Sequence, residues 1–301
     1  MSNIVLNPPA PEATGRSPLV RWIMRHSLAA FLLLTFGYSW LVGLPLLLSS
    51  WQILPFHLAR LPALLIQLLG AWGPTFSALL LTGLISGKAG LRALLSRLVR
   101  WRVGTQWYLF VVGSYGLIIL AALGVNALLG GALPEGVQLT PWYTVPLQFI
   151  LLFPLYLFVG GPLAEEPGWR GFALPRLLKN HSALFSTLLI GVIWALWHLP
   201  LFAAPGTGSG SGLAGFIWFF LQLSGWGVLL GWVYINTGSL LLCVLFHAAG
   251  NTFVSAVLPL VSGTRPYMLM DAFIWIVVIL VVIFAGPAHL SRTQRVTRQT
   301  Q

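Results

Sequence analysis

The sequence predicts an all-α integral membrane protein, a bundle of about eight transmembrane helices with a cytoplasm-facing polar cavity. Three observations support this fold class. The 301-residue chain is 57% hydrophobic and only 7% charged, and its mean hydropathy of +0.88 is unlike that of a soluble domain. Its apolar residues form runs long enough to cross a bilayer. Its few intramembrane ionisable groups gather in three short motifs, which indicates one functional site.

The chain divides into a long membrane domain and two tails. Residues 1–20 contain several Pro and Ser residues and are expected to form a disordered tail. Residues 21–288 form the predicted transmembrane domain, with a core at about 142–260, and residues 289–301 form a basic tail. The first apolar run, 28–48, is too long for a signal peptide and is expected to remain as a span. The other expected spans are 63–85, 107–129, 143–163, 183–201, 213–234, 240–260 and 272–284.

Two local features interrupt the early spans. The second span is expected to kink at Gly73-Pro74, because proline removes a backbone donor and clashes with the preceding turn. Residues 88–102 then place leucines at helical spacing on one face and bases on the other, which predicts a helix lying on the cytoplasmic leaflet. A surface for a partner protein is the alternative interpretation of that helix.

Charge placement predicts the orientation and some of the partners. The chain has 16 Lys and Arg against 5 Asp and Glu. The basic residues precede the first span, separate the second from the third and the fourth from the fifth, and follow the eighth. By the positive-inside rule, both termini of this multi-pass protein are expected in the cytoplasm of a cell, which is expected to be bacterial. The bases suit anionic lipid head groups, so no nucleic acid partner is expected.

The acidic pair Glu165 and Glu166 lies at a membrane boundary in a chain that has very few acids. A carboxylate at membrane depth costs a few kcal/mol, so such a pair indicates function. A helix break near 163–164 and a new helix from Pro167 would put both carboxylates at a positive helix end. Arg170 is four residues after Glu166, within ion-pair reach. We expect Arg170 to neutralise Glu166 and Glu165 to remain the reactive carboxylate.

Three more polar residues occur inside apolar runs: His198, His247 and Asn251. His247 and Asn251 are four residues apart and share a helix face. Antiparallel helices on either side of a turn near residues 179–181 would bring His198 to the depth of Glu165. A carboxylate and a neutral histidine can remove a proton from water, and a histidine and an amide can donate to an oxyanion. This set suits amide hydrolysis without a covalent intermediate.

These motifs resemble those of the CPBP family of intramembrane proteases, also called Abi, which includes the type II CAAX prenyl endopeptidases. The family motifs are Glu-Glu-x-x-x-Arg, an aromatic residue followed by x-x-x-His, and His-x-x-x-Asn. Phe is commoner in the family at the aromatic position than the Trp found here. The matching residues, in family order, are Glu165, Glu166 and Arg170, then Trp194 and His198, then His247 and Asn251.

The resemblance implies a helical bundle around a cavity open to the cytoplasm. It also implies that Glu165 and His198 activate water and that His247 and Asn251 form the oxyanion hole. The remaining motif residues would support the site, namely Glu166, Arg170 and Trp194. The implied partners are a lipid bilayer and a peptide or membrane-protein substrate, and no cofactor is implied.

Two other functions compete with this interpretation. A zinc metalloprotease would use Glu165, His198 and His247 as ligands, but the sequence lacks His-Glu-x-x-His, and zinc needs three well-supported ligands. A non-catalytic transporter or bacteriocin-immunity protein is the other alternative. Transporters usually contain repeated halves, and none is visible here.

Overall fold

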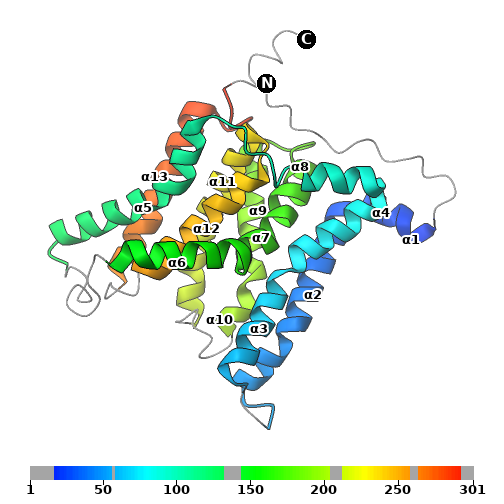
Figure 1. The fold of residues 1–301 in the computed structure, drawn as a ribbon, viewed down its shortest axis with the longest axis horizontal. Coiled ribbons are helices and arrows are strands. Elements are labelled where there is room, and N and C mark those ends of the chain that lie inside the picture. The colour runs from blue at the N-terminus through cyan, green and yellow to red at the C-terminus, as the bar shows by residue number, and fades with distance from the viewer. Residues whose placement is uncertain (1–16, 56–57, 132–143, 204–211, 258–263, 293–301) are drawn as a thin grey trace.

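The computed structural model describes residues 17–55, 58–131, 144–203, 212–257 and 264–292 (Figure 1). Within these ranges all regular secondary structure is helical, and eight helical segments are long and apolar enough to cross a membrane. The predicted all-α membrane bundle is therefore confirmed.

The chain enters the bundle through a short helix and a long one. Helix α1 (Pro18–Arg25) is capped by the Ser17 hydroxyl, which accepts a hydrogen bond from the Val20 backbone N–H. Helix α1 thus begins inside the predicted disordered tail, whose first sixteen residues lie outside the described ranges. Helix α2 (Ser27–Ser50) is the first span.

The second span consists of two helices. Helix α3 (Arg60–Ala71) ends beside Trp72, and helix α4 (Gly73–Leu95) begins with Pro74 in its first turn. The predicted kink is therefore confirmed. Gly73 lies against α2, where a Cβ atom would overlap the Ser39 hydroxyl, so glycine permits the close approach of the two helices.

The end of α4 turns along the surface of the bundle (Figure 1). The turn occurs at Gly87, whose φ of +60° and ψ of −157° are accessible to glycine and strained for other residues. Beyond it Leu94 is buried and Arg92 is exposed, as expected of an amphipathic helix. Arg97 was expected on the polar face, but it is buried and donates to the Tyr234 hydroxyl at 2.8 Å.

Helix α12 (Leu240–Val257) forms the centre of the bundle. It packs against α5, α6, α7 and α11. It is also the most buried of the eight spans, because 61% of its apolar stretch lies inside the protein. The helices around it are α5 (Thr105–Leu128), α6 (Thr144–Phe158), α9 (Ala183–Trp197), α10 (Leu199–Ala203), α11 (Gly212–Thr237) and α13 (Arg265–Ala285).

The segment after α6 is irregular and carries the acidic pair. It consists of α7 (Gly161–Glu166), the π-helix η2 (Pro167–Ala173) and α8 (Leu174–Leu177). The predicted break at 163–164 is wrong by a few residues, because Gly160 ends the previous turn and Pro162 lies in the first turn of α7. The two glutamates therefore end a short helix, and the expected stabilisation by a positive helix end does not apply.

Glycines bring α9 and α11 into close contact. A Cβ atom on Gly227 would lie 2.5 Å from the Gly191 Cα atom, and one on Gly191 would lie 2.8 Å from the Ser224 carbonyl oxygen. Small residues allow such backbone-to-backbone packing between membrane helices. The contact places the next turn of α9, with Trp194, against Trp226 of α11 at 5.9 Å between ring centroids.

Candidate active site

One cavity inside the bundle brings together the predicted catalytic residues. Its volume is about 490 Å³, and Glu165, His198, His247 and Asn251 all line it. These residues come from α7, the end of α9 and two turns of α12. Trp194, the aromatic residue of the second motif, also lines the cavity. The sequence-based expectation that separate motifs meet in one hollow is therefore met by the geometry.

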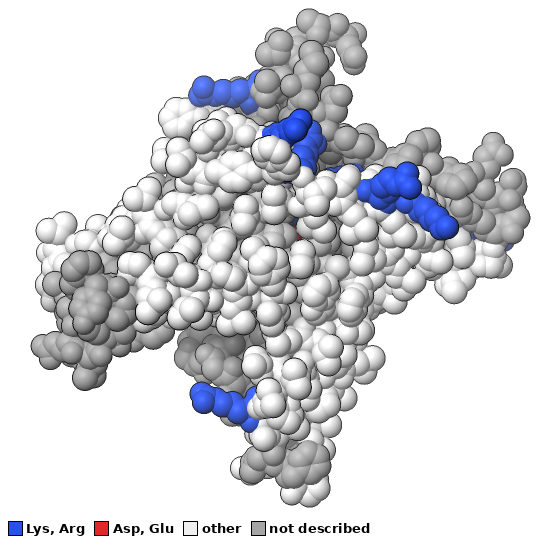
Figure 2. All heavy atoms as spheres, in the orientation of Figure 1, with Lys and Arg blue, Asp and Glu red and all other residues white. Residues whose placement is uncertain are grey.

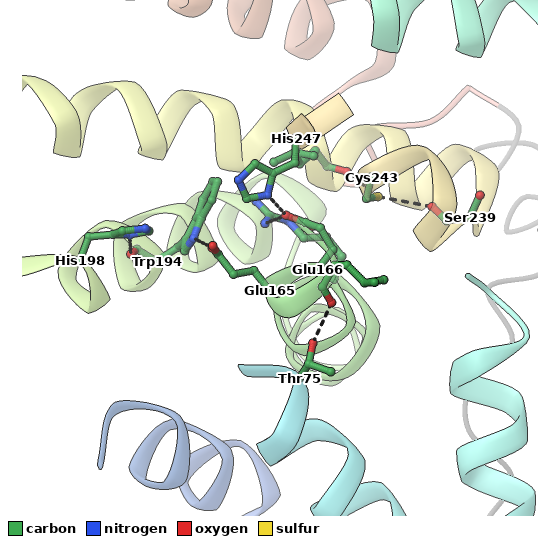
Figure 3. Close-up of polar contacts among 11 residues, drawn as sticks. Thr75, Glu165, Glu166, Trp194, His198, Ser239, Cys243 and His247 are labelled. Carbon is green, nitrogen blue, oxygen red and sulfur yellow. Dashed lines mark hydrogen bonds and ion pairs between the residues drawn. The ribbon is translucent and has the colours of Figure 1, made fainter. Parts of the chain in front are cut away.

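Trp194 connects two of these groups (Figure 3). Its indole N–H donates to Glu165 Oε2 at 2.5 Å, and its backbone carbonyl lies 2.8 Å from His198 Nδ1. A carbonyl can only accept, so Nδ1 of His198 must carry the hydrogen. In the neutral imidazole, Nε2 is then the nitrogen with a free lone pair. His198 is thus oriented to act as a base through Nε2.

Glu166 has a different set of partners. Its Oε1 atom accepts from Arg170 Nη1 at 2.9 Å and from His247 Nδ1 at 2.8 Å. Both Glu166 and Arg170 are fully buried, and the guanidinium lies over the Trp194 ring at 4.7 Å. The predicted pairing of Arg170 with Glu166 is present. A buried ion pair of this kind is costly to break, because the remaining charge would lack a partner.

The two neighbouring carboxylates point in different directions (Figure 3). Consecutive residues in an α-helix are separated by about 100° around the axis. Glu165 therefore reaches α9, whereas Glu166 reaches His247 on α12. Gly161 lies beside the Glu165 carboxylate, and a Cβ atom there would overlap Glu165 Oε1. This glycine leaves room for the carboxylate at the cavity wall.

His247 and Asn251 form the opposite part of the wall. The His247 ring makes T-shaped contacts with Trp194 and Trp226, at centroid distances of 5.0 and 5.3 Å. Its Nδ1 atom is bound to Glu166, which leaves Nε2 as its second nitrogen. The Asn251 side chain is half-buried and makes no hydrogen bond to the described part of the chain. Both groups are therefore available to a ligand in the cavity.

The residues of the alternative zinc site already have other partners. Glu165 Oε2 and His198 Nδ1 bind Trp194, and His247 Nδ1 binds Glu166. Within the described ranges, no three His, Cys, Asp or Glu side chains are grouped closely enough to hold a metal ion.

Two features of the structure were not anticipated from the sequence. The indole N–H of Trp194 binds Glu165, a contact that the commoner Phe could not make. Asp271 is buried in α13, with Oδ1 unpaired among the described residues. The expected eighth span, 272–284, begins one residue later and leaves Asp271 outside it. The apolar run directly after Asp271 was the available signal.

The position of the cavity conflicts with the predicted topology. In α2, the residues that line the cavity lie within 39–47, in the half of the helix that is farther from α1. In α9 and α10, they lie within 194–201, in the half that is farther from α8. The basic loops lie at the other end of these helices. Cytoplasmic termini and a cytoplasm-facing cavity were both predicted, and the structure does not allow both.

Comparison with known proteins supports the family indicated by the motifs. The family described as type II CAAX prenyl endopeptidase Rce1-like matches residues 146–253. A protein of Methanococcus maripaludis named CAAX prenyl protease 2 is 27% identical over 135 residues, which are 43% of this chain and 49% of that protein. The chain thus spans about half the length of this curated relative. The matched segment contains the acidic pair, both histidines and Asn251.

Proposed function

We propose, because residues 146–253 match the type II CAAX prenyl endopeptidase Rce1-like family, that this membrane protein is an intramembrane endopeptidase. It hydrolyses a peptide bond with a water molecule activated by Glu165 and His198. The observation that carries the proposal is the meeting of Glu165, His198, His247 and Asn251 on one cavity, with Nε2 of His198 free to accept a proton.

The reaction begins with proton removal from water. Glu165 or His198 Nε2 takes the proton as the water oxygen bonds to the carbonyl carbon of the substrate. The carbonyl oxygen becomes an oxyanion, and the Asn251 amide donates a hydrogen bond to it. When both ring nitrogens of His247 carry hydrogen, Nδ1–H donates to Glu166 and Nε2–H donates to the oxyanion. The C–N bond then breaks, and the stored proton passes to the leaving amine.

The other members of the motifs hold these groups in place. Trp194 fixes Glu165 through its indole and His198 through its carbonyl. Glu166 orients His247, and Arg170 balances the charge of Glu166. The proposal assigns no metal ion to the reaction. An activity that is lost on chelation and restored by zinc would contradict it.

The test compares cells that carry the wild-type protein with cells that carry Glu165→Gln at equal membrane abundance. Proteomics of the two strains should show an uncut precursor that accumulates only in the variant. His198→Ala should give the same precursor. His181→Ala is the matched control, because His181 is exposed at the turn before α9 and does not line the cavity. A fully active His198→Ala protein would refute the water-activation role.

A further inference from the structure

The two ends of the bundle differ in charge. Figure 2 shows most Lys and Arg gathered near one end of the view and a smaller group at the other. We call the first the basic end, and the positive-inside rule places it in the cytoplasm. Its members are Arg21, Arg25, Lys88, Arg92, Arg97, Arg100, Arg102, Arg176, Lys179 and Arg292. Within the described ranges, the bases at the other, charge-poor end are Arg60 and Arg265.

The cavity extends from the middle of the bundle toward the charge-poor end. The cavity-lining part of α3 is residues 64–71, and this helix begins at Arg60 on that end. In α11 the lining residues lie within 219–226, on the side of the helix start at Gly212. With the lining parts of α2, α9 and α10, four separate segments place the cavity on the same side of the bundle centre.

Exposure varies along the cavity wall. At the catalytic end, Glu165, Trp194 and His247 are each at most 5% exposed. Toward the charge-poor end, the lining residues Trp40 and Leu64 are 40% and 50% exposed. The exposed lining residues therefore lie on the charge-poor side of the catalytic groups.

A packed layer separates the catalytic groups from the basic end. Trp169, Phe172 and Leu94 in this layer are at most 1% exposed. The packing is tight, because a Cβ atom on Gly171 would lie 2.7 Å from Leu94 and 3.0 Å from Leu240. Arg97 closes the layer further by donating to the Gly171 carbonyl at 3.3 Å. A polypeptide coming from the basic end would have to displace this core.

The cavity wall is mostly apolar, and its polar side chains outside the catalytic groups are uncharged: Ser39, Gln67, Tyr115, Tyr156 and Gln222. Its outer part is formed by leucines of α2 and α3 together with Leu201 and Phe219. Among the described lining residues, Glu165 is the only one that is Asp, Glu, Lys or Arg. Such a wall suits an apolar segment and disfavours charged side chains, which would lose their hydration without gaining a partner.

We infer that the cavity receives its substrate from the extracytoplasmic side, and that this substrate is an apolar stretch of an exported or membrane-anchored polypeptide. The orientation follows from the position of the cavity relative to the basic end. The substrate class rests in addition on the proposed peptidase function. The packed layer at the basic end also argues against a substrate whose C-terminal tail lies in the cytoplasm and enters from that end.

Thiol labelling tests the orientation without requiring any activity. Cys243 is the single cysteine of the chain and is fully buried, so one introduced cysteine can be detected clearly. Gln67→Cys and Gln222→Cys place thiols on the cavity wall, and Lys179→Cys places one at the basic end. Spheroplasts of an expressing bacterium are treated with a charged, membrane-impermeant maleimide before or after lysis.

The expected result is that both cavity thiols react in intact spheroplasts, whereas the thiol at residue 179 reacts only after lysis. The wild-type protein should not react in either case, which controls for Cys243. The inference is overturned if either cavity thiol fails to react from outside, or if the thiol at residue 179 reacts in intact spheroplasts.

The precursor found with Glu165→Gln tests the substrate class. Its uncut bond should lie in an exported or outer-leaflet segment. A bond in a cytoplasmic tail would overturn this inference and leave the proposed peptidase intact. If no precursor accumulates, the proposed function and the substrate class fail together, while the labelling result still decides the orientation.

Discussion

At the scale of single residues, Trp194 has the most contacts within the site. It donates to Glu165, accepts from His198, and lies under the guanidinium of Arg170. Only the first of these contacts requires the indole nitrogen. The contact with His198 uses the backbone carbonyl of residue 194, which any residue supplies. The contact with Arg170 needs only an aromatic face, which phenylalanine also has. Substitution by Phe therefore isolates the hydrogen bond to the proposed catalytic carboxylate.

We predict that Trp194→Phe lowers kcat by about 10- to 100-fold, since a hydrogen bond to a charged group contributes about 1.5–3 kcal/mol. KM and the melting temperature should change little, because most of the ring packing remains. Cleavage kinetics on the identified precursor measure the effect. Trp232→Phe on α11 is the matched control, because this ring packs against Trp107 and Phe110 outside the cavity. Unchanged kcat in Trp194→Phe would show that the indole does not position Glu165.

Arg170 is expected to stabilise the folded protein rather than to take part in the cleavage reaction. We predict that Arg170→Met destabilises the protein by about 3–5 kcal/mol, because it leaves a buried carboxylate without its cation. Thermal unfolding in detergent and folded yield measure this loss. Adding Glu166→Gln to the same protein should recover part of the stability, since it removes the orphaned charge. Arg92→Met on the exposed face of α4 should remain close to wild type. Equal melting temperatures for the two single variants would contradict the prediction.

At the scale of elements, the contact between α9 and α11 sets the position of two catalytic contributors. Gly191 lies one turn before Trp194 and two turns before His198. Any side chain at 191 would meet the α11 backbone at Leu223 and Ser224. The spacing of these helices is therefore coupled to the geometry of the cavity wall.

We predict that Gly191→Val costs about 1–3 kcal/mol through overpacking and also reduces cleavage of the precursor. The two effects should appear together in thermal unfolding and in activity per folded molecule. Gly113→Ala on α5 is the control, because no atom lies within 4 Å of a Cβ placed there. Wild-type stability of Gly191→Val would mean that the two helices can separate without loss.

Much of the helix arrangement could be predicted from the sequence. Apolar runs of bilayer length gave all eight spans, and Gly73-Pro74 correctly marked the kink between α3 and α4. The π-helix at Pro167–Ala173 was missed, because helical periodicity does not distinguish a wide turn from a regular one. The end of the bundle toward which the cavity lies could not be predicted either. It depends on which half of each helix is packed solid, and that follows from tertiary contacts rather than from local pattern.

At the scale of the whole molecule, the separation of charge should make stability depend on the lipid. The basic end presents Lys88, Arg92 and other exposed bases on one side. Each base near an anionic membrane surface contributes about 1 kcal/mol, and salt screens this contribution.

We therefore predict a higher melting temperature in nanodiscs of anionic lipid than in zwitterionic ones, with the difference decreasing as salt is added. Lys88→Gln with Arg92→Gln should reduce the difference. Arg60→Gln at the charge-poor end is a control for loss of charge alone. A melting temperature that is the same in both lipids would show that the bases do not contact the head groups.

The wide turn of η2 has a consequence for how the chain tolerates insertions and deletions. Its seven residues link the acidic pair at the end of α7 to α8, which begins at the buried Leu174. Each residue of a π-helix turns less than the 100° of a regular α-helix, so after loss of one residue from η2 the rest can form a regular α-turn. The acidic pair would then keep nearly its present rotation about the helix axis. The same deletion in the regular turn of α8 would rotate the pair by about 100° and point Glu165 toward the imidazole on α12.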